Sequence, residues 1–420
     1  MSMAFPRMMK VSQHFEAPQV DDIPAAVKSQ IEGLDLSGKV KKGDSVAVTV
    51  GSRGINNIAV ITKGIVEALK DLGAKPFIVP AMGSHGGGTA EGQQEIIESY
   101  GVTEDFVGCP IRSTMEVVQV GTVEGEVPVY FDKYASEADH VVVSGRIKPH
   151  TGFVGEIESG LHKMMLIGLG KHKGAALYHQ AIVQYSFDRI IRGVAQQVID
   201  KCGVLFGLAI VENQYDQTAM LDAVPPEKFA EREKELLVLA KKWMPRLPFD
   251  RVDLLVIDAM GKNISGSGMD TNVIGRKFND HAAAEKEFPK VTRVLVRGLT
   301  PETHGNAAGI GMAEYCHKRI VDGMNVEATV INCMTGNAPS GAAIPVHFAT
   351  DRECLEQALR TVGFVEPENA RVLRVRDTLH LGELLVSEAY EKEMEGRQDL
   401  SVTAPAADMQ FDAQGDLLDW

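Results

Sequence analysis

The chain has few aromatic residues and no excess of basic ones, and both shortages bear on its partners. Aromatic residues make up 6% of the 420 residues, with only two tryptophans, which leaves little for stacking nucleic-acid bases. The 57 acidic residues outnumber the 43 basic ones, for a net charge of −14. Such a chain is poorly suited to neutralising a phosphate backbone. We therefore expect no nucleic-acid partner.

Long apolar runs and paired cysteines are also missing. No stretch of 18 or more apolar residues occurs, and the first ten residues contain no apolar run long enough for a signal peptide. The five cysteines are odd in number and never in CxxC spacing. This pattern is typical of reduced thiols rather than of disulfides, Cys-zinc sites or iron–sulfur clusters. The sequence predicts a cytoplasmic protein with no membrane contact.

Short apolar runs alternate with helical stretches along the chain. Strands are predicted at 45–51, 75–83, 140–145, 204–212, 252–261, 292–300 and 327–334. The stretch from Ile58 to Gly73 has helical period and ends in glycine. Uniformly apolar strands separated by helices are typical of a parallel sheet that is covered on both faces. The pattern predicts an α/β fold.

The length of the chain exceeds what one ordinary core fills, so two domains are expected. A charged helix ends at Pro245 and Pro248, and prolines just after a helix often mark a domain boundary. Each domain is predicted to be a mostly parallel sheet with flanking helices, with the active site in the cleft between them. The expected parts are a cofactor-binding and catalytic domain at 1–248, a smaller α/β domain at 249–396 and a loosely docked tail at 397–420.

The common nucleotide-binding motifs are missing from the sequence. GSGMDT at 266–271 and GIGMAE at 309–314 lack the third glycine of GxGxxG, and neither follows a strand in a βαβ turn. No GxxxxGK[ST] sequence occurs. A Rossmann dinucleotide site and a P-loop are therefore not expected.

Basic and imidazole side chains follow three predicted strands. Arg53 lies in GSRGINN, His85 in GSHGGGT and His150 in GRIKPH. Because ligands bind at the carboxyl ends of parallel strands, we expect the three to share one edge of the sheet. Any one of them could be a solvated turn residue, but three together favour a site. Thr89 is a candidate N-cap of the following helix, whose start would attract an anion.

Residues 147–179 hold four histidines and four lysines, although the chain is acidic. The apolar run MMLIG at 164–168 belongs inside the protein, which disfavours a fully solvated basic loop. Buried charges there would need an anion or a metal nearby. A zinc site from three of the histidines is an alternative, although their spacing matches no short zinc motif.

In this order and spacing, GSRGINN, GSHGGGT, RIKPH and the interval from Lys163 to His179 resemble the nickel-dependent lactate racemase family. Its members are two-domain α/β enzymes with a nickel-pincer nucleotide, a pyridinium mononucleotide whose two thiocarboxyl groups hold nickel. The resemblance is clearest over residues 45–180. It implies a racemase or epimerase that inverts C2 of a 2-hydroxy acid by moving a hydride to and from this cofactor.

The resemblance also implies roles for single residues. Lys163 would join the cofactor through a thioamide, and His179, sixteen residues later, would ligate nickel. His85 and His150 would be the acid and base, and Arg53 would lie near the substrate carboxylate. Contacts with the nucleotide or its phosphate are implied for Ser52, Gly86, Gly87 and Thr89.

A loop rich in glycine and serine, residues 258–276, follows the first strand of the second domain. We expect Lys262 and Asn263 in this loop to contact the substrate, while a plain loop remains the alternative. Its hydroxyl and amide groups suit a sugar acid or a dicarboxylic hydroxy acid better than lactate. His304 and His317 are expected to be structural or solvated.

The chain departs from the family pattern before the attachment point. Lactate racemases usually carry Gly-Gly-Arg-Lys there, whereas this chain has Ser159-Gly160-Leu161-His162-Lys163. The departure suggests a substrate other than lactate and makes Lys171 and Lys173 alternative attachment points.

Two rival functions remain open. One is a zinc- or iron-dependent hydrolase or lyase that uses His85, His150 and His179. The other is a non-catalytic protein that binds an acidic sugar or a nucleotide. For the racemase, the expected partners are a 2-hydroxy acid, the enzymes that make the cofactor and, in a homo-oligomer, further copies of the chain.

Overall fold

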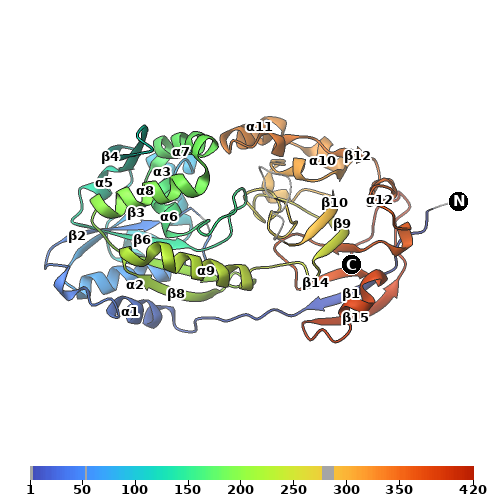
Figure 1. Ribbon diagram of the computed structural model, residues 1–420, viewed down its shortest axis with the longest axis horizontal. Coiled ribbons are helices and arrows are strands. Elements are labelled where there is room, and N and C mark those ends of the chain that lie inside the picture. The colour runs from blue at the N-terminus through green and yellow to red at the C-terminus, as the bar shows by residue number, and fades with distance from the viewer. Residues whose placement is uncertain (1–2, 53, 277–287) are drawn as a thin grey trace. The chain divides into compact units, whose positions relative to one another are not determined.

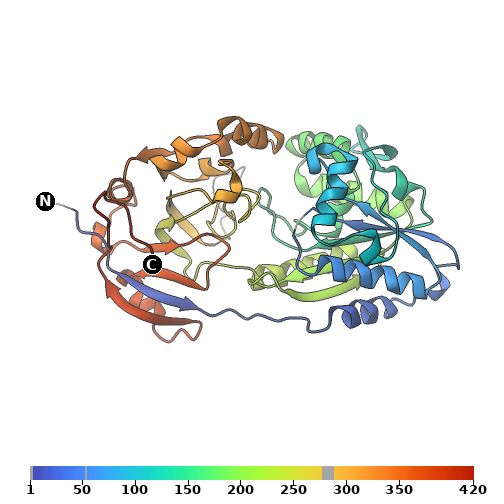
Figure 2. The same cartoon turned by 180° about the vertical axis from the view of Figure 1, so that it is seen from behind.

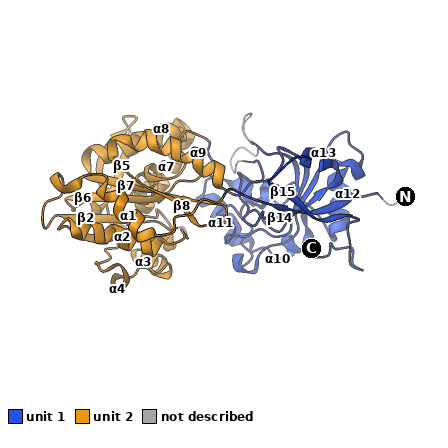
Figure 3. Ribbon diagram, turned by 90° about the horizontal axis from the view of Figure 1, so that it is seen from below, with its two compact units in different colours: residues 1–16, 151–153, 245–420 blue, residues 17–150, 154–244 orange. Residues whose placement is uncertain are grey.

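The computed structural model describes residues 3–52, 54–276 and 288–420 (Figure 1). The chain forms two compact units (Figure 3), with unit 1 made of residues 1–16, 151–153 and 245–420, and unit 2 of residues 17–150 and 154–244. Each unit contains a mostly parallel sheet with flanking helices. The predicted α/β class is confirmed.

The sheet of unit 2 has the strand order β3-β2-β6-β7-β8. Its strands are β2 (Ser45–Val50), β3 (Lys75–Pro80), β6 (His140–Arg146), β7 (Val204–Glu212) and β8 (Thr218–Val224). The first four in this order are parallel, and β8 is antiparallel to β7. The loops that follow β2, β3 and β6 therefore leave the sheet at one edge, as predicted.

Helices cover both faces of this sheet. They are α1 (Ile23–Glu32), α2 (Ile58–Asp71), α3 (Ala90–Ser99), α4 (Glu104–Val107), α5 (Lys133–Ser136), α6 (Leu161–Lys163), α7 (Lys171–Tyr185), α8 (Phe187–Lys201) and α9 (Phe229–Trp243). Ile61 and Ile65 of α2 share a core with Phe206 and Leu208 of β7. Gly207, between those two, faces the other way and lies against Leu161 of α6 and Phe229 of α9. Both faces are buried, as parallel sheets require.

A hairpin of β4 (Val117–Val123) and β5 (Val127–Asp132) was not predicted. Its turn has positive φ angles of 54° at Glu124 and 77° at Gly125. The signal for it is present, because Glu-Gly is flanked on both sides by runs rich in valine.

The sheet of unit 1 has the order β12-β11-β10-β9-β13-β14-β1-β15. Its strands are β1 (Met8–Gln13), β9 (Arg251–Ile257), β10 (Lys290–Val296), β11 (Tyr315–His317), β12 (Val346–Phe348), β13 (Val372–Val375), β14 (Glu383–Ser387) and β15 (Leu400–Ala407). The strands from β12 to β13 in this order are parallel, and the last three are antiparallel. The helices of unit 1 are α10 (Lys318–Gly323), α11 (Val326–Thr335), α12 (Asp351–Leu359) and α13 (Glu391–Met394).

The predicted strand at 327–334 is wrong, because these residues lie in helix α11. Its valine and isoleucine residues suggested a strand. The side chain of Asn325 instead accepts a hydrogen bond from the backbone N–H of Ala328 at 3.0 Å, which caps a helix. The local cap outweighs the weak strand propensity of the run.

The two ends of the chain also differ from expectation. Strand β1 pairs with β14 and β15 (Figure 2). Residues 1–16 therefore belong to unit 1, although they were expected in the domain at 1–248. The tail is not loosely docked, because β15 lies in the sheet. The physical reason is burial: Met8, Met9 and Val11 of β1 are enclosed in unit 1.

All five cysteines are free and buried. Burial raises the pKa of the thiols of Cys202, Cys316 and Cys354 to about 12. These three thiols are therefore protonated at neutral pH and are poor nucleophiles. Among the described residues, no helix has both the length and the apolarity needed to cross a bilayer.

Candidate active site

The loops after β2 and β3 are joined by a hydrogen bond between two predicted site residues. Nδ1 of His85 bonds to Oγ of Ser52, and the hydroxyl of Tyr100 donates to the carbonyl oxygen of Ser52 at 2.7 Å. The side chain of His85 is exposed, so it can reach a bound molecule. Arg53 lies outside the described residues.

The glycines after His85 form a turn that other residues would strain. Gly86, Gly87 and Gly88 have φ angles of 65°, 66° and 67°, which lie in the left-handed region. A Cβ on Gly86 would come within 2.5 Å of the carbonyl carbon of Gly92. Oγ1 of Thr89 accepts from the N–H of Gly92 at 3.1 Å, so the predicted N-cap of α3 is confirmed. Such a turn before a helix is suited to binding an anion.

The backbone of His150 is held by a buried carboxylate. Oε2 of Glu158 accepts from the N–H of His150 at 2.7 Å, and Oε1 accepts from Nζ of Lys241 in α9 at 2.6 Å. The ring of His150 packs against Phe187, with 5.4 Å between the centroids. These contacts fix the loop that follows β6.

The segment from α6 through the π-helical turn (Met164–Gly168) crosses the carboxyl edge of the sheet. Met164 lies against Gly51 after β2 and against Gly145 in β6, and a Cβ on Gly145 would lie 2.7 Å from Cγ of Met164. A Cβ on Gly168 would lie 2.9 Å from the carbonyl oxygen of Ala81, which follows β3. This packing places Lys163 at the edge from which the loops of His85 and His150 emerge.

A buried contact between a carboxylate and an imidazole precedes Lys163. Glu233 of α9 is 1% exposed, and its carboxylate accepts from the backbone N–H groups of Leu161 and His162 and from Nδ1 of His162. The carboxylate thereby satisfies donors at the start of α6 that would otherwise be unpaired. Both the backbone N–H and the ring of His162 are thus hydrogen-bonded to Glu233.

His179 lies on α7, and its electrostatics place Lys163 nearby. Burial lowers the pKa of His179, and the charge of the Lys163 ammonium lowers it further. The neutral imidazole therefore predominates at neutral pH, and this is the form that ligates metals. The two residues that the sequence paired by spacing are also coupled in the structure.

Replacing Lys163 with methionine is expected to raise the pKa of His179. The pKa should stay below the ordinary value of 6.5, because burial is the larger cause of the shift and remains. NMR titration of the histidine rings in the apoprotein measures this directly. Lys173→Met is the matched control, because that ammonium lies over the ring of Tyr130 at 4.3 Å. An unchanged His179 pKa in Lys163→Met would contradict the coupling.

The two alternative attachment lysines lie in different surroundings. Lys171 is 0% exposed, and its Nζ lies 3.0 Å from Oδ2 of Asp132. Lys173 is exposed beside Tyr130. Lys171 is enclosed and has no room for an attached group. The causes that lower the pKa of His179 are burial and the charge of Lys163, and Lys173 is not among them.

Residues 7–188 match the family described as the lactate racemase N-terminal domain. Over this segment the chain is similar to that family. The predicted resemblance to the lactate racemase family is confirmed. Similarity to this family supports an isomerase of the racemase or epimerase type.

Solved structures resemble this chain at low sequence identity. The lactate racemase apoprotein from Thermoanaerobacterium thermosaccharolyticum is 13% identical, with a TM-score of 0.48, over 94% of this chain and 96% of that one. A Thermotoga maritima protein from the Northeast Structural Genomics Consortium is 14% identical, with a TM-score of 0.49, over 76% of this chain and 81% of that one. Neither likeness bears on function at these values. A comparison with curated proteins gives no match.

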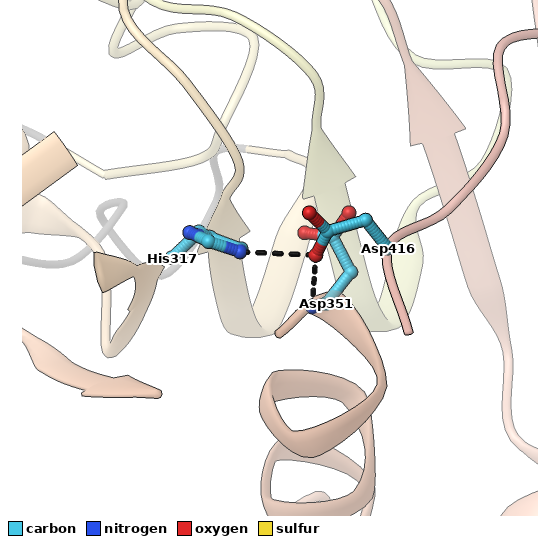
Figure 4. A group of neighbouring side chains, drawn as sticks. All are labelled: His317, Asp351 and Asp416. Carbon is cyan, nitrogen blue, oxygen red and sulfur yellow. Dashed lines mark hydrogen bonds and ion pairs between the residues drawn. The ribbon is translucent and has the colours of Figure 1, made fainter. Parts of the chain in front are cut away.

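The predicted histidines do not form a metal cluster with each other. In the part of the chain that the structure describes, three side chains with metal-ligand spacing occur together at His317, Asp351 and Asp416 of unit 1 (Figure 4). Among the described residues, the alternative zinc or iron site of His85, His150 and His179 is not found as a cluster.

The chemistry of the His317 cluster is that of a structural network. Nδ1 of His317 accepts from the N–H of Arg319 at 2.9 Å, so the proton of a neutral ring lies on Nε2, which is 3.0 Å from Oδ1 of Asp416. Arg297 binds Oδ2 of Asp351 at 2.7 Å. Arginine charges thus balance the carboxylates without a metal. The expectation that His317 is structural or solvated stays a prediction.

The predicted substrate contacts Lys262 and Asn263 lie in unit 1, in the turn after β9. Nζ of Lys262 donates to the carbonyl of Gly266 at 2.7 Å, and Oδ1 of Asn263 accepts from Oγ1 of Thr300 at 2.7 Å. Both contacts brace the turn. A contact with substrate stays a prediction.

Sequence analysis missed the buried carboxylates of Glu158 and Glu233. One signal was available, because Glu233 lies four residues after Phe229 and four before Leu237, on the apolar face of α9. An acidic residue on such a face indicates a buried partner. No local signal identified Glu158.

Proposed function

We propose that the chain is a racemase or epimerase that inverts C2 of a 2-hydroxy acid with a nickel-pincer nucleotide. The features that carry the proposal are Lys163 at the carboxyl edge of the sheet and the partly buried His179, whose pKa is lowered by burial and by the charge of Lys163. A metal-ligating imidazole and an amine for covalent attachment are the two groups that this cofactor needs from the protein. The family of residues 7–188 supports the same reaction type.

The residues of the candidate site fit such a cofactor. Gly86 and Gly87 have positive φ angles and form a turn that other residues would strain, and with Thr89 at the start of α3 they would hold the phosphate. Ser52 would contact the nucleotide from the neighbouring loop. Lys163 would provide the attachment and His179 the nickel ligand. When bound, the cofactor supplies the hydride acceptor and donor.

The protein itself must move a proton at the substrate hydroxyl. His85 and His150 follow β3 and β6, and each would serve one stereoisomer, one taking the proton and the other returning it. Because Nδ1 of His85 bonds to Ser52, we assign the exchange to Nε2. Glu158 would keep His150 in place through its backbone N–H.

Three further basic or polar side chains would recognise the substrate. Arg53 would bind the carboxylate with two hydrogen bonds. Lys262 and Asn263 would contact further polar groups, which favours a sugar acid or a dicarboxylic hydroxy acid over lactate. The cofactor would have to be made by other enzymes of the cell.

The decisive test is intact mass and nickel content after co-expression with the enzymes that make the nickel-pincer nucleotide. We expect stoichiometric nickel and an adduct that maps to Lys163, with the Lys173→Met variant unchanged. Nickel without an adduct would mean that the nucleotide is held non-covalently. Neither nickel nor nucleotide would reject the proposal and favour a zinc or iron enzyme.

The loaded protein would then be screened with single stereoisomers of 2-hydroxy acids. Substrate deuterated at C2 should keep its label after inversion, since the hydride returns to the same carbon. Replacement of the label by solvent hydrogen would indicate removal of a C2 proton and contradict hydride transfer.

A further inference from the structure

Three fully buried polar side chains meet beneath the loop that carries His85. They are Lys171 at the start of α7, Asp132 at the end of β5 and Gln93 of α3, and each is 0% exposed. Burial lowers the pKa of Lys171 and raises the pKa of Asp132, and the attraction between the two charges opposes both shifts. Because buried charges are destabilising unless well paired, this group, here called the Lys171 hub, requires an explanation.

The amine of Lys171 has three acceptors around it. Nζ lies 3.0 Å from Oδ2 of Asp132 and 3.3 Å from Oε1 of Gln93, and it donates to the carbonyl of Pro80. The contacts with Pro80 and Gln93 are hydrogen bonds, and the contact with Asp132 is an ion pair whose Oδ2 accepts no hydrogen bond. Pro80 is the last residue of β3, and the amine therefore holds the point where the His85 loop begins.

Gln93 extends this contact to His85 itself. Because its Oε1 faces the ammonium of Lys171, the orientation of the amide is determined. Its Nε2 then donates to the carbonyl oxygens of Gly83 at 2.8 Å and His85 at 3.3 Å. The backbone of His85 is thus linked to Lys171 through one side chain.

The other end of the hub is the helix of His179. Lys171 is eight residues after Lys163 and eight before His179. Its φ angle is 56°, which a residue with a side chain adopts only when its surroundings impose it. The enclosed amine provides that constraint, so movement of Lys171 would shift the start of α7.

We propose that Lys171, held by Asp132 and acting through Gln93, is a positioning residue that fixes His85 relative to the helix that carries His179. The inference rests on the proposed function for its catalytic meaning. The contacts that link Lys171 to His85 are present in the apoprotein and can be tested there without the cofactor.

The test separates positioning from stability with paired variants. Lys171→Met leaves the Asp132 carboxylate buried without its counter-charge and should destabilise the protein. Lys171→Met/Asp132→Asn removes both charges and should recover much of that stability, while the Pro80 carbonyl and Oε1 of Gln93 still lack their donor. We expect kcat of the loaded double variant to fall by about 10²-fold, as small misplacements of catalytic groups do, with KM little changed. A purely structural role predicts that kcat returns together with the melting temperature.

The second readout uses ring nitrogen NMR signals of histidines in the apoprotein. In the double variant, the signals of His85 and His179 should shift, whereas His140, which begins β6 and pairs with Asp44, should not. Gln93→Leu should shift the His85 signal in the same way. This variant replaces the double variant in the experiment if the double variant does not fold. Unshifted His85 and His179 signals would overturn the inference. Shifted signals in a protein that inverts no 2-hydroxy acid would reject only the proposed function.

Discussion

Replacing His85 with asparagine is expected to lower kcat/KM for both stereoisomers of the substrate by the same factor, about 10²–10⁴. The asparagine amide can keep a hydrogen bond with Ser52 but cannot exchange a proton near neutral pH. The factor must be equal in both directions, because the ratio of the two kcat/KM values is the equilibrium constant, which no mutation alters. Rates measured from each pure stereoisomer test this.

Three comparisons complete the experiment. His150→Asn should lose activity to a similar extent, because inversion needs both histidines. His140→Asn is the control, because this residue begins β6 at the opposite edge of the sheet and bonds to Asp44 at 3.2 Å. Calorimetric titration with substrate should give little change in affinity for His85→Asn. Full turnover in both site variants would show the acid/base assignment to be wrong, and binding without turnover in the loaded wild type would favour a binding protein.

Replacing Glu233 with leucine is expected to destabilise unit 2 by about 3–5 kcal/mol. Leucine has a similar volume but leaves two backbone N–H groups and the imidazole of His162 without their acceptor in a buried site. Denaturant unfolding of the apoprotein measures the loss. The two tryptophans of the chain lie in different units, so a Trp420→Phe background leaves Trp243 of α9 as a fluorescence reporter of unit 2.

Glu235→Leu is the matched control on the same helix. Glu235 has 55% of its side chain exposed and pairs with Arg232, so its loss should change stability by no more than about 1 kcal/mol. Equal unfolding midpoints for the two variants would contradict the role given to Glu233.

Local pattern in the sequence determined most of the secondary structure of unit 2 and the order of its motifs. The runs at β2, β3, β6 and β7 are apolar throughout because both faces of a parallel sheet are buried, and this property is visible in the sequence. Parallel pairing then placed the loops of Ser52, His85 and His150 at one edge. The motifs GSRGINN, GSHGGGT and RIKPH, together with the interval from Lys163 to His179, carried the resemblance to the family that residues 7–188 match.

Only the tertiary structure decided which buried polar groups support these loops. Glu233 is 71 residues from His162, Lys241 is 83 from Glu158, and Lys171 is 78 from Gln93. The pairing of β1 with β15 likewise joins the two ends of the chain. Propensity and periodicity act over a few residues, whereas these contacts depend on how distant elements pack. A buried charge takes its role from the partner that packing brings to it, and a linear pattern does not contain that information.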